Sequence, residues 1–321
     1  MVSIIINVCN NICQLRKTIE SIIIQTYEYC EIILVDHGSE NVAVNIVQEY
    51  QEKLAPEAKL KVIVSGPQCS TADALNNGLS VATGAYIMTC EAGNVLGRRH
   101  IEKLIRGIID MDADIAVGID GVQECGMYEL SENIYDMKQF ACTVNPEPAS
   151  KLYQAENIFH YKLQFPDIAM TEMAFFLQYL YISHTASVED IPCVSLPETK
   201  DASQVFPYMQ RWIDDFPAPK RQDFYYILQN IKVREYSRMA MESVSIHSRT
   251  AHRRIFIRLH KEIIRTGREY RNYLHEQMQA EVREAQKRYH FRFFYCNRLY
   301  RLFFRVKNGC YEKIWHNKEK E

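Results

Sequence analysis

Polar side chains follow several short apolar runs of this chain, at the points where the runs end. Asp36 and His37 close the second run, and Glu91 and Asn94 follow the fourth. If these runs are parallel strands, the polar residues lie outside the carboxyl ends of the strands, where open α/β sheets bind their ligands. The sequence therefore predicts a polar binding site at one edge of a sheet, with carboxylates at residues 36 and 91.

The runs that must position these residues are rich in β-branched side chains and show no polar alternation. They span Ser3–Val8, Glu31–Asp36, Lys61–Ser65, Ala85–Thr89 and Asp114–Gly118. Between them apolar residues recur at helical spacing, as Leu15, Ile19 and Ile22 do before the second run. Strands buried on both faces and alternating with helices are typical of α/β proteins. Residues 1–118 are therefore predicted to form a mostly parallel sheet flanked by helices.

Two common nucleotide-binding loops are absent from the sequence. It contains neither Gly-x-Gly-x-x-Gly nor Gly-x-x-x-x-Gly-Lys, which disfavours a dinucleotide dehydrogenase and a P-loop NTPase. The composition, 47% hydrophobic and 24% charged, is that of a globular protein. Ten cysteines are scattered without Cys-x-x-Cys spacing. We expect them to be free, mostly buried thiols and predict neither a zinc site nor a disulfide framework.

The small net charge of −2 hides two oppositely charged parts. The 70 residues from His252 onward carry 18 basic and 8 acidic side chains, which leaves 20 basic and 32 acidic ones before them. The pattern is irregular from residue 118 to about 197, apart from a helix expected at Thr171–Ile182, and almost wholly helical after residue 204. We therefore predict an α/β domain over residues 1–200 and a basic helical extension over residues 204–321.

Five short sequences occur in the first 90 residues in a fixed order. They are SIIINVCN at 3–10, SIIIQTY at 21–27, IILVDHGS at 32–39, ALNNGL at 74–79 and GAYIM at 84–88. In order and spacing they resemble the motifs of family 2 nucleotide-sugar glycosyltransferases, which have the GT-A fold. The family versions are a strand ending Pro-Val-Tyr-Asn, then Ser-Ile-x-x-Gln-Thr-Tyr, Val-Asp-Asp-Gly-Ser, Ala-x-Asn-x-Gly-Leu and Gly-x-Tyr-Ile. The resemblance covers about residues 2–110 and implies a GT-A fold.

The resemblance also implies a donor site. In the family, an Asp-x-Asp after the fourth strand contacts the ribose and holds the divalent metal that bridges the diphosphate. Glu91 and Gly93 stand at the matching positions, so Glu91 could still ligate Mg²⁺ or Mn²⁺, while Gly93 offers only backbone. The resemblance thus implies a metal site weakened by the loss of its second carboxylate. The donor-binding residues that it implies are Val8, Asn10, Asp36, His37, Asp73, Asn76 and Glu91.

The resemblance assigns the acceptor base less directly. Inverting members carry a Glu-Asp pair at the start of a helix, and the Asp deprotonates the acceptor hydroxyl. This chain has Glu172 followed by Met173, which cannot accept a proton. Glu172 is therefore the candidate base, and the alternative is a carboxylate that only interacts favourably with the helix dipole.

Each donor-side residue also has a purely structural interpretation. Asp36 could form a turn before a glycine, His37 could be a polar turn residue, and Glu91 an exposed loop carboxylate. Asp73 could be an acid in the first turn of a helix, and Asn76 could hold a turn through side-chain hydrogen bonds.

These features predict transfer of a sugar from a nucleotide donor, UDP-linked by resemblance, to a glycan or lipid-linked acceptor in surface polysaccharide synthesis. The alternative is an inactive GT-A module that acts as a binding or scaffold partner at the membrane. Arginines at 298, 301 and 305 lie beside an apolar stripe in the basic extension, which is typical of an interfacial membrane helix or of a helix packed on protein. We expect a cytoplasmic protein, peripheral on the inner face of the cell membrane, that binds no nucleic acid.

Overall fold

The structure is a computed structural model of the chain and divides it into two compact units, Met1–Tyr225 and Tyr226–Glu321. Each unit is described by itself. The described residues are 1–8, 12–36, 46, 49–50, 59–64, 69–122, 125–130, 134–144, 147–192, 201–216, 224–242 and 249–290. The predicted site residues Asn10 and His37 lie outside this set.

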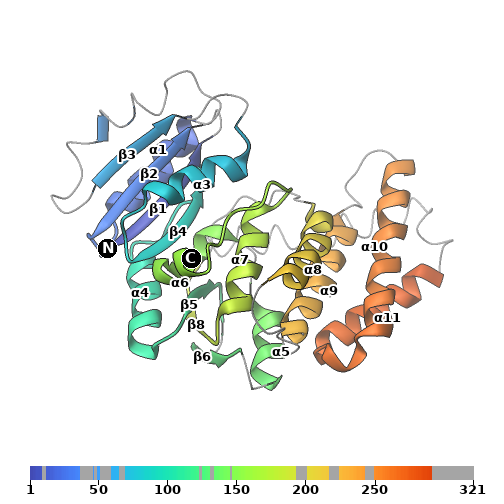
Figure 1. Cartoon of the computed structure of the whole chain (residues 1–321). Coiled ribbons are helices and arrows are strands. Elements are labelled where there is room, and N and C mark those ends of the chain that lie inside the picture. Colours follow the sequence, from blue (N-terminus) through green and yellow to red (C-terminus); the bar gives the residue numbers. More distant parts are fainter. Residues whose placement is uncertain are drawn as a thin grey trace, which may run out of the picture. The chain divides into compact units, whose positions relative to one another are not determined.

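The first unit is built on an eight-stranded sheet in the order β3-β2-β1-β4-β7-β5-β8-β6 (Figure 1). Its strands are β1 Val2–Val8, β2 Cys30–Asp36, β3 Lys59–Val64, β4 Tyr86–Glu91, β5 Ile115–Ile119, β6 Gly126–Glu129, β7 Lys151–Gln154 and β8 Thr185–Asp190. Strands β1 to β4 are parallel to one another, and β7 runs antiparallel to β4 and β5. Strand β8 is parallel to β5, and β6 is antiparallel to β8. The predicted mostly parallel α/β sheet is confirmed, with two antiparallel strands added to it.

Helices cover both faces of this sheet. The helices of the first unit are α1 Ile12–Ile23, α3 Thr71–Val81, α4 His100–Met111, α5 Ile134–Thr143, α6 Ala155–His160, α7 Thr171–Ile182 and α8 Val205–Asp215. Apolar residues of α1 and α4 form one buried cluster with alternate residues of β1, β2 and β4. Helix α3 packs on β1 and β2, and it comes so close that a Cβ at Gly78 would lie 2.5 Å from Ile5 Cγ2. Small residues thus let helix and strand backbones approach closely.

Helix α7 has the predicted bounds but a different environment. Residues 171 to 181 are all buried, so the helix has no solvated face and lies in the interior of the unit. Its Tyr181 packs edge-on against Trp212 of α8, with ring centroids 5.5 Å apart. Because α8 packs on α7, the first unit extends to Tyr225, beyond the boundary expected near residue 200. The stretch expected to be irregular also contains β6, β7 and β8.

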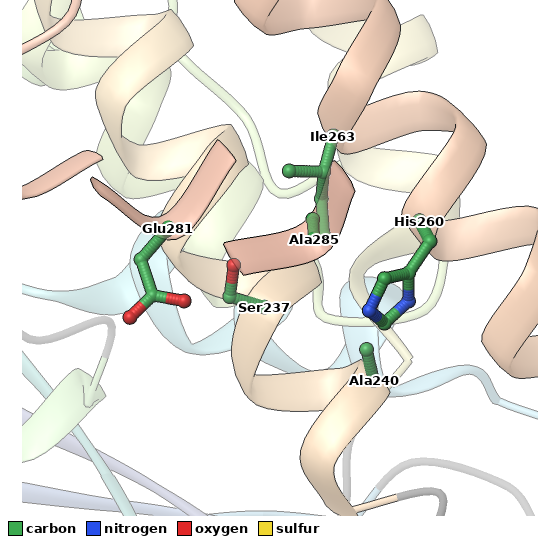
Figure 2. A pocket seen from close by; sticks show the side chains of 6 residues that line it. All are labelled: Ser237, Ala240, His260, Ile263, Glu281 and Ala285. Carbon is green, nitrogen blue, oxygen red and sulfur yellow. The ribbon is translucent and has the colours of Figure 1, made fainter. Parts of the chain in front are cut away.

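The described residues of the second unit form helices, which are most of α9 Phe224–Glu242 together with α10 Arg249–Glu269 and α11 Glu276–His290. Helices α10 and α11 pack closely at Gly267, where a Cβ would lie 2.3 Å from Val282 Cγ1. Figure 2 shows a small cavity between these helices with Ser237, His260 and Glu281 among its lining residues. Its volume of about 10 Å³ is room for roughly one water molecule, too little for a substrate.

No helix in the described part of the chain is long and apolar enough to cross a membrane. The helix proposed around arginines 298, 301 and 305 lies outside the described residues. Five of the described cysteines are free thiols, and of these Cys30 and Cys90 are buried whereas Cys13 and Cys125 are exposed.

Candidate functional site

The order of the strands places a switch point at β1. The chain runs from β1 to β2 and β3 on one side and then returns to place β4 on the other side of β1. In such sheets a crevice forms outside the carboxyl ends of the two strands at the reversal, because the connecting helices leave in opposite directions. The carboxyl ends of β1, β2 and β4 are therefore the edge at which a ligand is expected, and it is the edge predicted from the sequence.

The strand register brings both predicted carboxylates to this edge. Val8 pairs with Asp36 of β2, and Asn7 pairs with Glu91 of β4. With about 4.8 Å between neighbouring strands, the Cα atoms of Asp36 and Glu91 are about 10 Å apart across β1. Asp36 is fully buried and Glu91 is partly exposed. The two carboxylates thus stand on either side of the end of β1, where strand alternation directs Asp36 to the face covered by α1 and α4 and Glu91 to the opposite face.

Asn7 adds a polar group between them that the sequence analysis did not single out. Its side-chain oxygen is buried and has no hydrogen-bond partner among the described residues. An unsatisfied buried acceptor costs about 1–3 kcal/mol, so such groups are rare away from ligand sites. The signal was present in the sequence, since the family motif has proline where this chain has Asn7.

The turn after β4 is held by neighbouring side chains. The side-chain oxygen of Asn94 accepts a hydrogen bond from the Glu91 backbone N–H at 2.8 Å. Gly93 has a φ of 115°, which favours glycine, and its N–H donates to Thr18 Oγ1 of α1 at 2.8 Å. A side chain at residue 93 would therefore strain the backbone.

A buried polar cluster of Asn94, Glu147 and Lys151 also stabilises this turn. Asn94 Nδ2 donates to Glu147 Oε1 at 3.4 Å, and the ammonium of Lys151 donates to the Glu147 carbonyl oxygen. Lys151 is fully buried, and its Nζ lies 4.6 Å from the centre of the Phe176 ring. The sequence does not reveal this cluster, because Asn94 lies more than 50 positions before Glu147 and Lys151.

The side chains of Gln25 and Thr26, in the Gln-Thr-Tyr motif, make structural hydrogen bonds. Gln25 Nε2 donates to the Ser21 and Gly97 carbonyl oxygens, and Gln25 Oε1 accepts from the Ile101 N–H. Thr26 Oγ1 donates to Glu102 Oε2 at 2.7 Å. The end of α1 is thereby fixed to the segment that leads from the turn after β4 into α4.

Two predicted donor-side residues on α3 make structural contacts. Asp73 and Ser70 form a capping box at the start of the helix, in which each side chain accepts from the other residue's backbone N–H. Asn76 Nδ2 donates to the Phe165 carbonyl oxygen and Asn76 Oδ1 accepts from the Phe165 N–H, both at 2.9 Å. Their direct contact with a donor stays a prediction.

Glu172 lies in the first turn of α7 and is 8% exposed. Burial, together with the charge of Glu172 and then the nearby Tyr179, raises the pKa of the Tyr153 hydroxyl well above its usual value. Glu172 is thus close to Tyr153 of β7, the strand next to β4. This places the candidate base on the β7 side of β4, and its catalytic role stays a prediction.

The residues present do not form a complete metal site. Among the residues that the structure describes, no three His, Cys, Asp or Glu side chains gather closely enough to hold a metal ion. At the turn after β4 the protein offers one carboxylate, Glu91, because Gly93 has no side chain. A divalent ion there would need most of its oxygen ligands from the ligand itself.

Comparison with known proteins relates most of the first unit to glycosyltransferases. The sequence model of Glycosyl transferase family 2 matches residues 3–159. The glycosyltransferases GlyG and GlyA of Streptococcus pneumoniae serotype 4 are each 30% identical to the chain, over 118 and 117 residues. These alignments cover 37% and 36% of this chain, but only 38% of GlyG and 16% of GlyA. The chain therefore spans well under half of these curated relatives.

Solved structures resemble a larger part of the chain. The crystal structure of S. aureus TarS 1–349 superposes with a TM-score of 0.62 at 14% identity, covering 96% of this chain and 91% of that one. The same protein in complex with UDP gives a TM-score of 0.61. A mannosyltransferase from Pyrobaculum calidifontis in complex with GDP-Man and Mn²⁺ gives 0.56 at 16% identity, covering 90% of this chain and 87% of that one. At such identities the likeness establishes the GT-A fold.

Proposed function

The chain belongs to glycosyl transferase family 2 through residues 3–159, and from this premise we propose that it transfers a sugar from a nucleotide donor to an acceptor hydroxyl. We propose a UDP-linked donor and a glycan or lipid-linked acceptor in surface polysaccharide synthesis. TarS 1–349, whose fold this chain shares, has been crystallised with UDP and with UDP-GlcNAc, which supports a uridine donor.

The observation that carries the proposal is the pairing of Val8 with Asp36 and of Asn7 with Glu91 at the switch point of the sheet. It places two carboxylates and an amide oxygen at the edge where this class of sheet binds ligands. Asp36 is proposed to accept a hydrogen bond from the base and Glu91 from the ribose hydroxyls, because ionised carboxylates only accept hydrogen bonds. This recognition uses no carboxylate at residue 93.

Glu172 is the proposed general base. Its carboxylate would take the proton of the acceptor hydroxyl as that oxygen forms a bond to the anomeric carbon of the sugar, while the bond from that carbon to the diphosphate breaks. The nucleoside diphosphate leaves with the bonding electron pair. A largely water-free position favours this role, because solvent then competes less with the acceptor hydroxyl for the base.

A bound Mg²⁺ or Mn²⁺ would supply charge neutralisation at the leaving diphosphate. Glu91 is the described side chain that could ligate it, and no step of the proposal passes through the ion. Dependence of UDP binding on Mn²⁺ is therefore a measurement to make, with titrations in the presence of Mn²⁺ and of EDTA.

The experiment that tests the proposal uses the full chain with UDP and UDP-GlcNAc. Calorimetry measures UDP binding, and released UDP measures donor turnover with and without candidate acceptors. We expect Glu91→Gln to weaken UDP binding at least tenfold and Glu172→Gln to lower turnover about a hundredfold or more while UDP still binds. The control is Glu156→Gln, which makes the same change at an exposed site on α6. Unchanged binding and turnover in both variants would refute the assigned roles, and absence of UDP binding by the unaltered chain would refute the uridine donor.

We further propose that the basic C-terminal residues hold the enzyme on the cytoplasmic face of the membrane. The support is the pattern of arginines and aromatic residues between 288 and 305. Cosedimentation with vesicles containing 30% anionic lipid should retain the full chain and release a chain that ends at residue 290. Equal binding of the two chains would contradict the proposal.

A further inference from the structure

The amide of Asn76 joins two segments that are 89 residues apart in the sequence. It donates to the carbonyl oxygen of Phe165 and accepts from the N–H of the same residue, each at 2.9 Å. This pair of hydrogen bonds is like the pair that two backbone segments exchange in a sheet. It fixes both the orientation of the segment at Phe165 and its distance from helix α3. Asn76 therefore holds the chain at Phe165 against helix α3.

The ring of Phe165 contacts helix α7, so the position of Phe165 affects that helix. It stacks on Phe175 with ring centroids 4.0 Å apart and an interplanar angle of 12°. Phe175 follows Glu172 by three positions, so both lie on the same side of the first turns of the helix. Phe175 also packs edge-on against Tyr153, whose pKa is raised first by burial and then by the charge of Glu172. Asn76, Phe165 and the candidate base are thus connected through one packed cluster.

The chain leading into α7 requires such support. Met170, which precedes the helix, has a φ of 57°, in the left-handed region that costs a side-chain-bearing residue about 1 kcal/mol or more. Residue 169 is tied by its backbone N–H to Gln204 Oε1 at 3.1 Å. Contacts from the surrounding structure must therefore offset this strain. The Asn76 contact holds the preceding chain at Phe165 from helix α3, and Phe175 is held by Tyr153 of β7.

We propose that Asn76 is a positioning residue that sets the place of Glu172 by holding Phe165 and, through Phe175, the start of α7. This inference rests on the proposed function for its catalytic consequence, while its structural part does not. It gives a different role to a residue that the sequence placed beside the donor. On this view the helix next to the nucleotide and the helix carrying the base are mechanically coupled.

The first test measures the coupling without any substrate. Asn76→Asp removes the donor to the Phe165 carbonyl and places negative charge against it, and Asn77→Asp makes the same change at the exposed neighbouring position. By amide hydrogen exchange we expect the first variant to lose protection at least tenfold over residues 174–176, beginning with Ala174, whose N–H donates to the Met170 carbonyl oxygen. The Asn77 variant should match the unaltered chain. Unchanged protection in the Asn76→Asp variant would overturn the inference, whatever the enzyme's activity.

The second test separates positioning from donor contact. We expect Asn76→Asp to lower kcat for UDP-GlcNAc turnover about tenfold or more with the Kd for UDP changed less than twofold. In a Glu172→Gln background the same substitution should have no further effect, because both changes act on one group. A weakened Kd for UDP, or losses that multiply in the double variant, would overturn positioning through Glu172. If the unaltered chain binds no UDP, the proposed function is refuted. Hydrogen exchange still tests the structural part of the inference, because that measurement uses no substrate.

Discussion

His100 gives the sharpest prediction about stability, because it is buried next to the segment that supports the candidate site. It stands at the start of α4, is 3% exposed, and its Nε2 donates to the Ala149 carbonyl oxygen at 2.8 Å. Burial lowers the pKa of His100 from 6.5 to about 4, the bond to Ala149 opposes this shift, and the charge of Lys103 adds to it. The folded chain therefore holds a neutral imidazole at neutral pH.

The sign of the effect follows from the lowered pKa. Above pH 6.5 the imidazole is neutral in both states, so its full contribution is present. Below pH 6.5 the unfolded chain takes up a proton that the folded chain refuses. The linkage relation gives a loss of about 2 kcal/mol in unfolding free energy between pH 7.5 and pH 5, and about 3 kcal/mol once the pH is well below 4.

Urea unfolding followed by near-ultraviolet circular dichroism measures this loss at a series of pH values. The unaltered chain should lose about 2 kcal/mol more than His100→Gln between pH 7.5 and pH 5, since glutamine does not titrate. His184→Gln, the same change at an exposed histidine, should keep the pH dependence of the unaltered chain. Parallel curves for the unaltered chain and His100→Gln would refute a buried, neutral His100.

Three further substitutions test other parts of the first unit. Burial raises the pKa of Glu31, but hydrogen bonds from Lys61, Ser3 and Thr83 outweigh it and lower the pKa to about 2. Glu31→Gln should therefore lower the unfolding free energy by about 3 kcal/mol at pH 7. The unaltered chain should lose the same contribution as the pH falls from 4.5 to 2. Gly78→Ala should cost about 1–3 kcal/mol in urea unfolding, because its Cβ would meet β1 at 2.5 Å; a neutral result would show that α3 can shift. Gly93→Ala should cost about 1–3 kcal/mol through its φ of 115° and weaken UDP binding, and an unchanged Kd would detach this turn from the donor site.

The described turn after β4 differs from the carboxylate-rich one implied by the family resemblance. Gly93 and Asn94 form a compact turn held by Thr18 and supported by Glu147 and Lys151. An Asp introduced at residue 93 would have to adopt the same left-handed backbone. Restoring the family motif by a single substitution is therefore unfavourable on conformational grounds alone.

Much of the site could be predicted from local sequence. The β-branched runs predict strands, their lack of alternation predicts burial on both faces, and a parallel sheet brings the ends of its strands to one edge. These relations hold within a few residues of each position, so Asp36 and Glu91 could be assigned to one edge without knowledge of the other contacts. The start and end of α7 could be predicted for the same reason, from its continuous apolar sequence.

Other features depend on contacts between residues far apart in the chain. Insertion of β7 between β4 and β5, burial of Glu172 against Tyr153, and the bonds from Asn76 to Phe165 each depend on which segments meet. A single polar residue has the same sequence signature whether it faces water, a ligand or a distant backbone.

The sequence by itself thus determined the first five strands and the edge where their polar ends gather, because these follow from periodicity and spacing along the chain, and its motifs indicated the family by resemblance. Only the tertiary structure decided that the Asn76 amide is hydrogen-bonded to Phe165 and that the Glu172 carboxylate is buried. The physical reason is that burial and hydrogen bonding are properties of surroundings, and most of the surroundings of Asn76 and Glu172 come from other parts of the chain.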